Sequence, residues 1–351
     1  MIAKLLIRKA IIANSTLRSR YPLLESNDWF MGIPMKNALL MLLAGVVLAA
    51  AGIPADAQAS TKKKAVAAKK SPVRVAIKAK APRKAKSMQR GATMDDAHRL
   101  ALQSSAVLVQ DQTTGAILLE KNPNAVLPIA SITKLMTAMV ALDAKPDLNE
   151  MLAIGDDDVD NLKGTRSRLK VGTHLSREEM LRLALMSSEN RAASALSRHY
   201  PGGREAFVAA MNQKAHSLGL ADTRFADPTG LTAANVSSPR DLAKMVDAAH
   251  RYPLIREFST TSEGEFSIAG RAQQFRNTNT LVKSPTWEIG LSKTGYISEA
   301  GKCLVMQVWL NNKPTIIVLL DSWGKVTRIA DAQRIKRWIE SLASNGGMVR
   351  S

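Results

Sequence analysis

Residues 303–320 read CLVMQVWLNNKPTIIVLL and place two apolar runs on either side of a polar segment. Cys303–Leu310 and Thr315–Leu320 have the length and composition of β-strands. Asn311–Pro314 consists mostly of residues that favour turns, so we expect it to join the two strands in an antiparallel hairpin. Trp287–Gly295 is predicted to be a third strand that precedes them.

A second hairpin is predicted near the start of the folded region. Ala106–Val109 and Ala116–Leu119 are apolar runs separated by Asp111–Gly115, a segment that contains a turn glycine. Between the two ends of the chain the periodicity is helical, and one more helix closes the domain. We therefore predict an α+β fold in which both ends share one antiparallel sheet, flanked by helices, with a helical region inserted between them. The expected helices are Leu135–Leu142, Ser176–Arg198, Gly203–Leu218, Ser238–Ala249 and Lys325–Leu342.

The chain has 351 residues and a formal net charge of +19, but its basic residues are concentrated in one segment. Residues 60–90 hold twelve Lys or Arg and no acidic residue, whereas residues 91–351 hold 31 basic and 27 acidic residues. The folded part is therefore nearly balanced in charge. Cys303 is the only cysteine, which excludes an internal disulfide and a cysteine-based metal site. Because Cys303 lies in an apolar run, we expect an inert, buried thiol.

The sequence before residue 60 predicts export. Residues 35–59 have the layout of a signal peptide, with a basic start, an apolar stretch and a final Ala-Gln-Ala. A membrane-spanning helix needs about 20 apolar residues, and this stretch is shorter, so we expect cleavage after Ala59, with an uncleaved anchor as the alternative. Residues 1–34 are interpreted as an extension that arises from a start site assigned too far upstream, with a long n-region as the alternative. The protein is expected in the periplasm.

Residues 60–94 are predicted to be a disordered basic linker. They contain no aromatic residue and too little apolar bulk to offset the entropy of ordering. Such a segment resembles a nucleic-acid-binding tail, but an exported protein does not meet nucleic acid, so no specific nucleic acid is expected. We expect either nonspecific contact with anionic envelope surfaces or a solvated tether without a partner. The folded domain is expected over residues 95–345.

Pro128–Lys134 contains a candidate catalytic pair, Ser131 and Lys134. The segment opens a helical stretch, so the two side chains lie three residues apart on one helix face. A serine hydroxyl becomes a strong nucleophile when a base takes its proton, and a lysine can be that base if burial or other cations keep it neutral. The free N–H groups of a helix amino terminus can also stabilise an oxyanion. The spacing alone is weak evidence, because Ser60–Lys63 and Ser322–Lys325 share it.

Two further strings strengthen the assignment. Ser188-Glu189-Asn190 is the only Ser-x-Asn in the chain, and Lys293-Thr294-Gly295 follows an apolar run where we expect a strand. Ser-x-x-Lys, Ser-x-Asn and Lys-Thr-Gly in this order are the motifs of the active-site serine enzymes that bind penicillin. From Asp95 to Leu342 the chain resembles the low-molecular-mass penicillin-binding proteins, serine peptidases of the D-Ala-D-Ala carboxypeptidase family. The resemblance is strongest to the D-alanyl-D-alanine endopeptidases of the penicillin-binding protein 7 type, and Gly164–Leu169, Met186–Ala193 and Asp227–Leu231 also carry it.

The resemblance implies a β-lactamase/transpeptidase-like fold and a role for each motif residue. Ser131 matches the nucleophile that the penultimate D-alanyl carbonyl acylates, and Lys134 matches its general base. Ser188 matches the hydroxyl that relays a proton toward the leaving amine. Asn190 matches the amide that holds the acyl side of the peptide and keeps Lys134 oriented. Because two nearby amines disfavour each other's charged form, we expect Lys293 to help keep Lys134 neutral.

The strand motif is implied to bind substrate. Lys293 matches the lysine that raises the local positive potential, and Thr294 matches the hydroxyl that binds a substrate or β-lactam carboxylate. Gly295 is expected to leave room for the substrate along the strand edge. The backbone N–H groups of Ser131 and Tyr296 are implied to form the oxyanion hole.

The resemblance implies hydrolysis of D-alanyl bonds in peptidoglycan peptides, with β-lactams as covalent inhibitors. It leaves three activities: endopeptidase on cross-linked peptides, carboxypeptidase on uncrosslinked stems, and β-lactamase. The absence of a Glu-x-x-Leu-Asn string disfavours the β-lactamase, and the short sequence after Asp321 favours the endopeptidase, since the related carboxypeptidases carry a further carboxy-terminal domain. The alternative from another class is a wall-binding, penicillin-reactive protein with little turnover.

No cofactor or metal is expected. The nucleophile, the base and the oxyanion donors all come from the protein, and the five histidines lack metal-ligand spacing. The acidic residues between 156 and 160 lack the glycine and the terminal glutamate of a calcium loop, so we expect a solvated acidic turn there.

Overall fold

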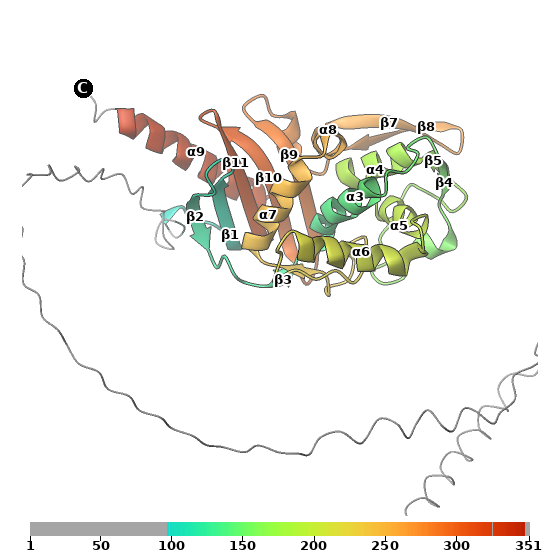
Figure 1. The fold of residues 1–351 in the computed structure, drawn as a ribbon. Coiled ribbons are helices and arrows are strands. Elements are labelled where there is room, and N and C mark those ends of the chain that lie inside the picture. The colour runs from blue at the N-terminus through green and yellow to red at the C-terminus, as the bar shows by residue number, and fades with distance from the viewer. Residues whose placement is uncertain (1–96, 98, 325, 348–351) are drawn as a thin grey trace, which may run out of the picture. The chain divides into compact units, whose positions relative to one another are not determined.

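The computed structural model describes residue 97 and residues 99–324 and 326–347, which are built around a five-stranded antiparallel sheet. The strand order is β2-β1-β11-β10-β9, so the first and the last strands of the fold lie side by side (Figure 1). This confirms the prediction that both ends share one sheet. The extension, the signal peptide and the whole linker lie outside the described residues. The strands are β1 (Ser104–Asp111), β2 (Ile117–Lys121), β9 (Glu288–Ile297), β10 (Gly301–Leu310) and β11 (Lys313–Ser322).

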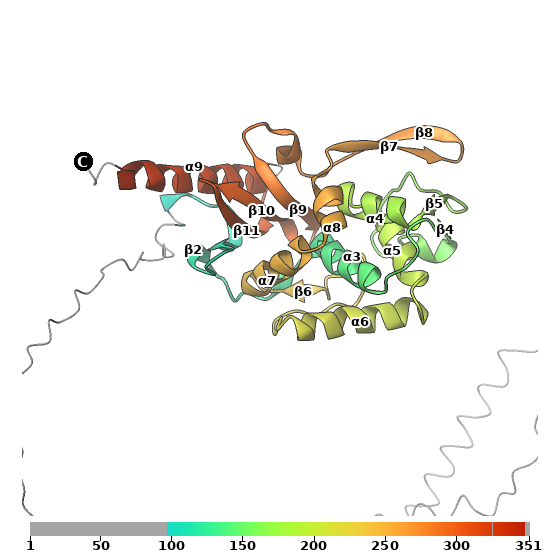
Figure 2. The ribbon, with the colours of Figure 1, turned by 45° about the horizontal axis from the view of Figure 1, so that its top comes forward.

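The central strands bury apolar side chains on both faces of the sheet. In β10, Leu304 and Met306 pack into a cluster with the closing helix α9 (Thr327–Gly347), whereas Cys303 and Val305 pack into the larger cluster of the other helices. Successive residues of a strand point to opposite faces, which is why the apolar run of β10 is continuous. Figure 2 shows α9 on one side of the sheet and α3, α7 and α8 on the other.

The segment between β2 and β9 is mainly helical, as predicted. Ser238 caps the start of α7, where its hydroxyl accepts a hydrogen bond from the Asp241 N–H, and Ser176 and Glu179 form a capping box at the start of α4. No helix among the described residues is long and apolar enough to span a membrane. The helices are α3 (Thr133–Asp143), α4 (Arg177–Met186), α5 (Asn190–Arg198), α6 (Gly203–Ser217), α7 (Pro239–His250) and α8 (Pro253–Thr260).

The single helix expected over Ser176–Arg198 is wrong, because the chain there forms two helices, α4 and α5. Between them Ser188 has a φ of 61°, in the left-handed region that no helical residue adopts. The Glu189 N–H donates to the Leu183 carbonyl and closes α4, and α5 then begins at Asn190. The break exposes the Ser-x-Asn motif at a turn instead of leaving it on one side of a helix.

The turn expected over Asn311–Pro314 is shorter in the structure. Asn311 and Asn312 alone connect β10 to β11, and their φ values of 51° and 60° are those of a two-residue type I′ turn. Several small elements were not predicted. They are β3 (Leu127–Pro128), β4 (Met151–Ala153), β5 (His174–Ser176), β6 (Val236–Ser237), β7 (Glu263–Ile268), β8 (Arg271–Arg276), and the short helices η1 (Ala130–Ile132), η2 (Asp156–Asp158) and η3 (Thr280–Lys283).

Candidate active site

Ser131 and Lys134 meet where η1 leads into α3. Lys134 Nζ lies 2.9 Å from Ser131 Oγ, 2.7 Å from Asn190 Oδ1 and 2.7 Å from the Thr229 carbonyl oxygen. The Lys134 side chain is fully buried, whereas Ser131 is half-buried. The structure therefore joins the first two motifs of the sequence around one buried amine.

The buried amine of Lys134 has an unusually low pKa. Burial lowers the pKa to about 7, although the carboxyl groups of Asp227 and Glu189 act in the opposite direction. A neutral amine has two N–H donors and one lone pair. Since Asn190 Oδ1 and the Thr229 carbonyl can only accept, they use the two N–H groups and leave the lone pair for the hydroxyl of Ser131.

This pKa predicts how acylation of Ser131 depends on pH. Below pH 7 Lys134 becomes an ammonium without a lone pair, so we expect the acylation rate to fall about tenfold per pH unit there and to level off above about pH 8. Glu189, Asp227 and Lys293 are the other titratable groups close to Lys134. Rates of β-lactam labelling, followed by mass spectrometry between pH 5 and pH 9, test this dependence. A constant rate over this range would show that Lys134 is not the base.

Lys293 and Ser188 form the second polar pair of the site. Lys293 Nζ lies 3.0 Å from Ser188 Oγ, and the lysine is fully buried in β9. Burial lowers the pKa of Lys293 well below its ordinary value, and the charges of Lys134 and Arg328 lower it further. Burial is the largest cause at both lysines. Lys134 lowers the pKa of Lys293, but the expected effect of Lys293 on Lys134 is not found, because burial alone accounts for the low pKa of Lys134.

Arg328 supplies a positive charge to the site that no sequence motif indicated. Its Nη1 donates to the Gly295 carbonyl at 3.1 Å and to the Cys303 carbonyl at 3.4 Å, which fixes α9 against β9. Burial lowers the pKa of Arg328 as well, but an arginine side chain stays charged in proteins. Arg328 therefore adds a positive charge near Lys293, and this charge contributes to lowering the pKa of Lys293. Cys303 is buried, as predicted, and burial raises the pKa of its thiol to about 11.

β9 presents its outer edge to the site because it is the last strand of the sheet. Thr294 Oγ1 donates to Thr278 Oγ1 at 2.6 Å, and Tyr296 is 61% exposed. Gly295 also has a packing role that was not predicted. A Cβ atom on it would lie 2.8 Å from the Ile129 carbonyl oxygen and 3.2 Å from Ser131 N. Its missing side chain lets β9 approach the backbone that carries the candidate nucleophile.

The loop after Asp227 completes the site and had no assigned role. The Asp227 carboxylate accepts hydrogen bonds from the N–H groups of Thr229, Gly230 and Thr232. These bonds form a turn that points the Thr229 carbonyl at Lys134. An Asp followed by Thr and Gly is a turn signal in the sequence, but the carbonyl that it positions leaves no signal.

The solvated acidic turn expected near Asp156 is wrong for one of its members. Asp158 is buried, and its carboxylate pairs with Arg198 at 2.8 Å and accepts a hydrogen bond from Ser194 Oγ at 2.8 Å. Asp158 therefore ties η2 to α5 as a structural ion pair. The described residues contain no group of His, Cys, Asp and Glu that could hold a metal ion.

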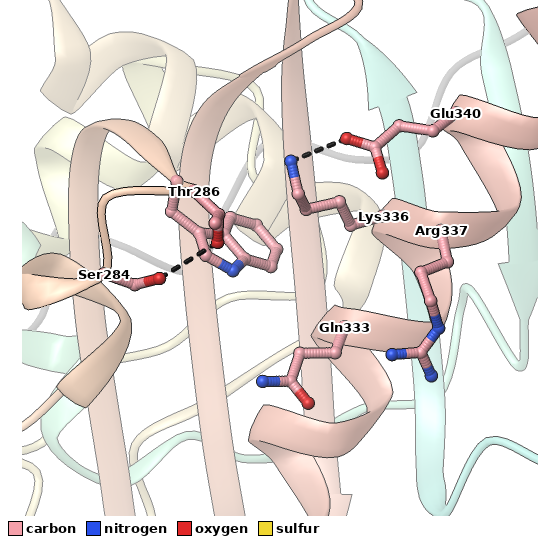
Figure 3. Close-up of a pocket in the computed structure, with 7 residues that line it drawn as sticks. Ser284, Thr286, Gln333, Lys336, Arg337 and Glu340 are labelled. Carbon is pink, nitrogen blue, oxygen red and sulfur yellow. Dashed lines mark hydrogen bonds and ion pairs between the residues drawn. The ribbon is translucent and has the colours of Figure 1, made fainter.

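A hollow of about 490 Å³ on the α9 side of the sheet is separate from this site. Figure 3 shows its polar walls, with an ion pair between Lys336 and Glu340 and a hydrogen bond between Ser284 and Thr286. Trp287, another wall residue, immediately precedes β9 and is eight residues from Gly295, about 25 Å along an extended strand. The hollow is therefore too far from Ser131 to hold the bond that reacts there.

A buried lysine hydrogen-bonded to an accessible serine is the arrangement of a peptidase that forms an acyl-enzyme. The match to known families agrees with this class. A family model described as D-alanyl-D-alanine carboxypeptidase matches residues 92–324, and the chain belongs to this family. The chain is 51% identical to the D-alanyl-D-alanine endopeptidase of Pseudomonas aeruginosa over 242 residues, which are 68% of this chain and 78% of that protein. It is 49% identical to the Escherichia coli K12 protein of the same name, over 68% of this chain and 77% of that protein.

Solved structures confirm the predicted fold class. The Streptomyces K15 DD-transpeptidase superposes with a TM-score of 0.64 at 27% identity, covering 68% of this chain and 98% of the other. The D-alanyl-D-alanine carboxypeptidase of Mycobacterium tuberculosis H37Rv superposes with a TM-score of 0.61 at 26% identity, covering 68% and 90%. The chain is thus a serine DD-peptidase with the penicillin-binding, transpeptidase-like fold.

Proposed function

We propose that the chain is an endopeptidase that hydrolyses D-alanyl bonds in peptidoglycan cross-links, with Ser131 as nucleophile and Lys134 as general base. The observation that carries the proposal is the hydrogen-bond pattern of Lys134. When Lys134 is neutral, the two acceptors at 2.7 Å take its N–H groups, and its lone pair is left for the Ser131 hydroxyl 2.9 Å away. The names of the two relatives quoted above support the endopeptidase over the carboxypeptidase.

The proposed reaction proceeds through an ester. Lys134 takes the hydroxyl proton as Ser131 Oγ bonds to the D-alanyl carbonyl carbon, and the backbone N–H groups of Ser131 and Tyr296 hold the oxyanion. Ser188 relays the proton that Lys134 has taken to the leaving amine, the C–N bond breaks, and the acyl part of the peptide remains on Ser131 as an ester, with Lys134 neutral again. Water, deprotonated in the same way, then hydrolyses the ester and restores the hydroxyl.

The remaining motif residues are proposed to hold the substrate. A peptide can lie along the free edge of β9 as an added strand, with Asn190 on its acyl side. Lys293, Thr294 and Arg328 supply the donors for a carboxylate of the substrate or of a β-lactam. An anionic group beside Lys293 would favour its charged form, against the effect of burial.

The proposed location is the periplasm, reached with the signal peptide of residues 35–59. The basic linker of residues 60–94 is proposed to contact anionic envelope surfaces without specificity, and no specific nucleic acid is proposed as a partner. We propose β-lactams as covalent inhibitors, because the β-lactam ring opens as its carbonyl acylates the same serine that the peptide acylates. No cofactor is proposed.

Mass spectrometry of muropeptides tests the activity. The protein is incubated with cross-linked dimers and, separately, with uncrosslinked pentapeptides, beside a Ser131→Ala control. Conversion of dimers to monomers only by the wild type is the expected result. Release of D-alanine from pentapeptides with dimers untouched would establish a carboxypeptidase, and turnover of neither would favour the wall-binding alternative.

A further inference from the structure

We propose that Thr165 and Asp160 are positioning residues that fix the orientation of the Asn190 amide and, through it, the lone pair of Lys134. This inference rests on the proposed function. The hydrogen bonds of both side chains go to groups other than Ser131, and both residues belong to the loop between η2 and β5. Thr165 lies in the Gly164–Leu169 segment, to which the proposed reaction assigns no role.

The hydrogen bonds from Asp160 to Lys134 have a fixed direction. Asp160 Oδ2 accepts from Thr165 Oγ1 at 2.6 Å, since an ionised carboxylate has no proton to donate. Because the Thr165 hydroxyl donates its single proton to Asp160, its oxygen can only accept, and it accepts a hydrogen bond from Asn190 Nδ2 at 3.1 Å. The amide nitrogen therefore faces Thr165, and Asn190 Oδ1 faces Lys134 Nζ at 2.7 Å.

The reverse orientation of the amide would disable the base. With Nδ2 facing Lys134, an amide N–H would donate to the lone pair that has to accept the Ser131 proton. It would also disfavour the ammonium form of Lys134 and lower its pKa. Lys134 alone does not prevent this orientation, because a neutral amine can either donate to an amide oxygen or accept from an amide nitrogen. Thr165 removes the ambiguity.

The loop is built to hold Thr165 in place. Asp160 also accepts hydrogen bonds from the backbone N–H groups of Leu162, Lys163 and Thr165, each at 2.9 Å. Burial acts against its charge, but these bonds and the one from the Thr165 hydroxyl lower the pKa of Asp160, which keeps it an acceptor at neutral pH. An ionised Asp160 is what gives the chain of hydrogen bonds its direction.

Two further hydrogen bonds join the Gly164–Leu169 segment to the residues on either side of Asn190. Ser167 Oγ donates to Glu189 Oε2 at 2.7 Å, and Arg191 Nη1 donates to the Leu169 carbonyl at 2.8 Å. The residues on both sides of Asn190 are therefore bound to the segment that carries Thr165. This explains why a loop far from the nucleophile in sequence controls the amide.

Acylation by a β-lactam, measured as a function of pH, tests the proposal in the full-length protein. Thr165→Val keeps the shape of the side chain but loses the acceptor, so the plateau rate is expected to fall about tenfold and the pH midpoint to move below that of the wild type. Thr165→Ser keeps the hydroxyl and should restore both values. Thr286→Val, at an exposed threonine in the hollow of Figure 3, is the matched control and should match the wild type.

A double-mutant cycle separates orientation from structure. In an Asn190→Ala background there is no amide to orient, so Thr165→Val should have no further effect on the rate. A loss that persists in this background, or wild-type rates and midpoint in Thr165→Val, would overturn the proposal. If Thr165→Val fails to fold, Asp160→Asn carries the same test. Failure of the wild type itself to be acylated would instead overturn the proposed function.

Discussion

Ser131→Ala is expected to abolish covalent labelling by penicillin and conversion of muropeptide dimers while leaving the protein folded. The hydroxyl is the only nucleophile that we place at the reacting carbonyl, and alanine offers none. Stability should change little, because Lys134 keeps its bonds to Asn190 and to the Thr229 carbonyl. The loss of one hydrogen bond is worth about 1 kcal/mol or less, a change in melting temperature of no more than about 4 °C.

Intact-protein mass spectrometry after incubation with benzylpenicillin measures the labelling, and a thermal melt measures stability. Ser322→Ala is a useful control, because Ser322 shares the Ser-x-x-Lys spacing but lies at the end of β11, where its hydroxyl donates a hydrogen bond to Thr327 Oγ1. It should label like the wild type. Labelling that survives in Ser131→Ala would move the nucleophile elsewhere, and a large drop in its melting temperature would mean that the hydroxyl is structural.

The sheet could be predicted from the sequence because its strands are strong local signals. β10 and β11 are apolar on both faces, and two asparagines that accept positive φ separate them. The break between α4 and α5 could not be predicted, because it depends on contacts distant in sequence. Ser188, whose φ is positive, accepts a hydrogen bond from Lys293 of β9, and the Met186 carbonyl accepts one from the Thr278 N–H. Helical periodicity continues across the break and conceals it.

In the candidate site, too, some residues could be predicted from the sequence and others could not. Ser131, Lys134, Asn190 and Lys293 could be found, because their motifs occur in a recognisable order. In the structure Lys134 Nζ lies 2.9 Å from Ser131 Oγ and 2.7 Å from Asn190 Oδ1, and Lys293 Nζ lies 3.0 Å from Ser188 Oγ. Their roles stay predictions until the variants are measured. Thr229 could not be found, because it contributes only a backbone carbonyl, which every residue has. Arg328 and Thr165 were missed because they act through contacts that their neighbours in sequence do not reveal.

Gly230→Ala is expected to disrupt both stability and acylation, because Gly230 lies against the backbone of the candidate nucleophile. It has a φ of 81°, and a Cβ there would overlap the Ala130 carbonyl and lie 2.9 Å from Ser131 N. Neither the Gly230 loop nor η1 can move easily to relieve the overlap. The Asp227 carboxylate fixes the Gly230 loop, and η1 is held by β9 through the close approach at Gly295. Ser131 and the Thr229 carbonyl must therefore move apart, which misplaces Lys134 relative to the hydroxyl.

The backbone strain and the overlap together should cost about 3 kcal/mol or more, a loss of at least about 6 °C in melting temperature. The acylation rate should fall about 100-fold or more, since small displacements of catalytic groups have effects of this size. Gly172→Ala is the matched control: its φ is 83°, but no atom lies within 4 Å of the added Cβ. Gly172→Ala should lose only about 1–2 kcal/mol of stability, from backbone strain alone, and should be acylated at the wild-type rate. Equal stability and equal rates in the two variants would contradict the close contact between the loop and η1, because overlap with η1 is the only difference between them that we invoke.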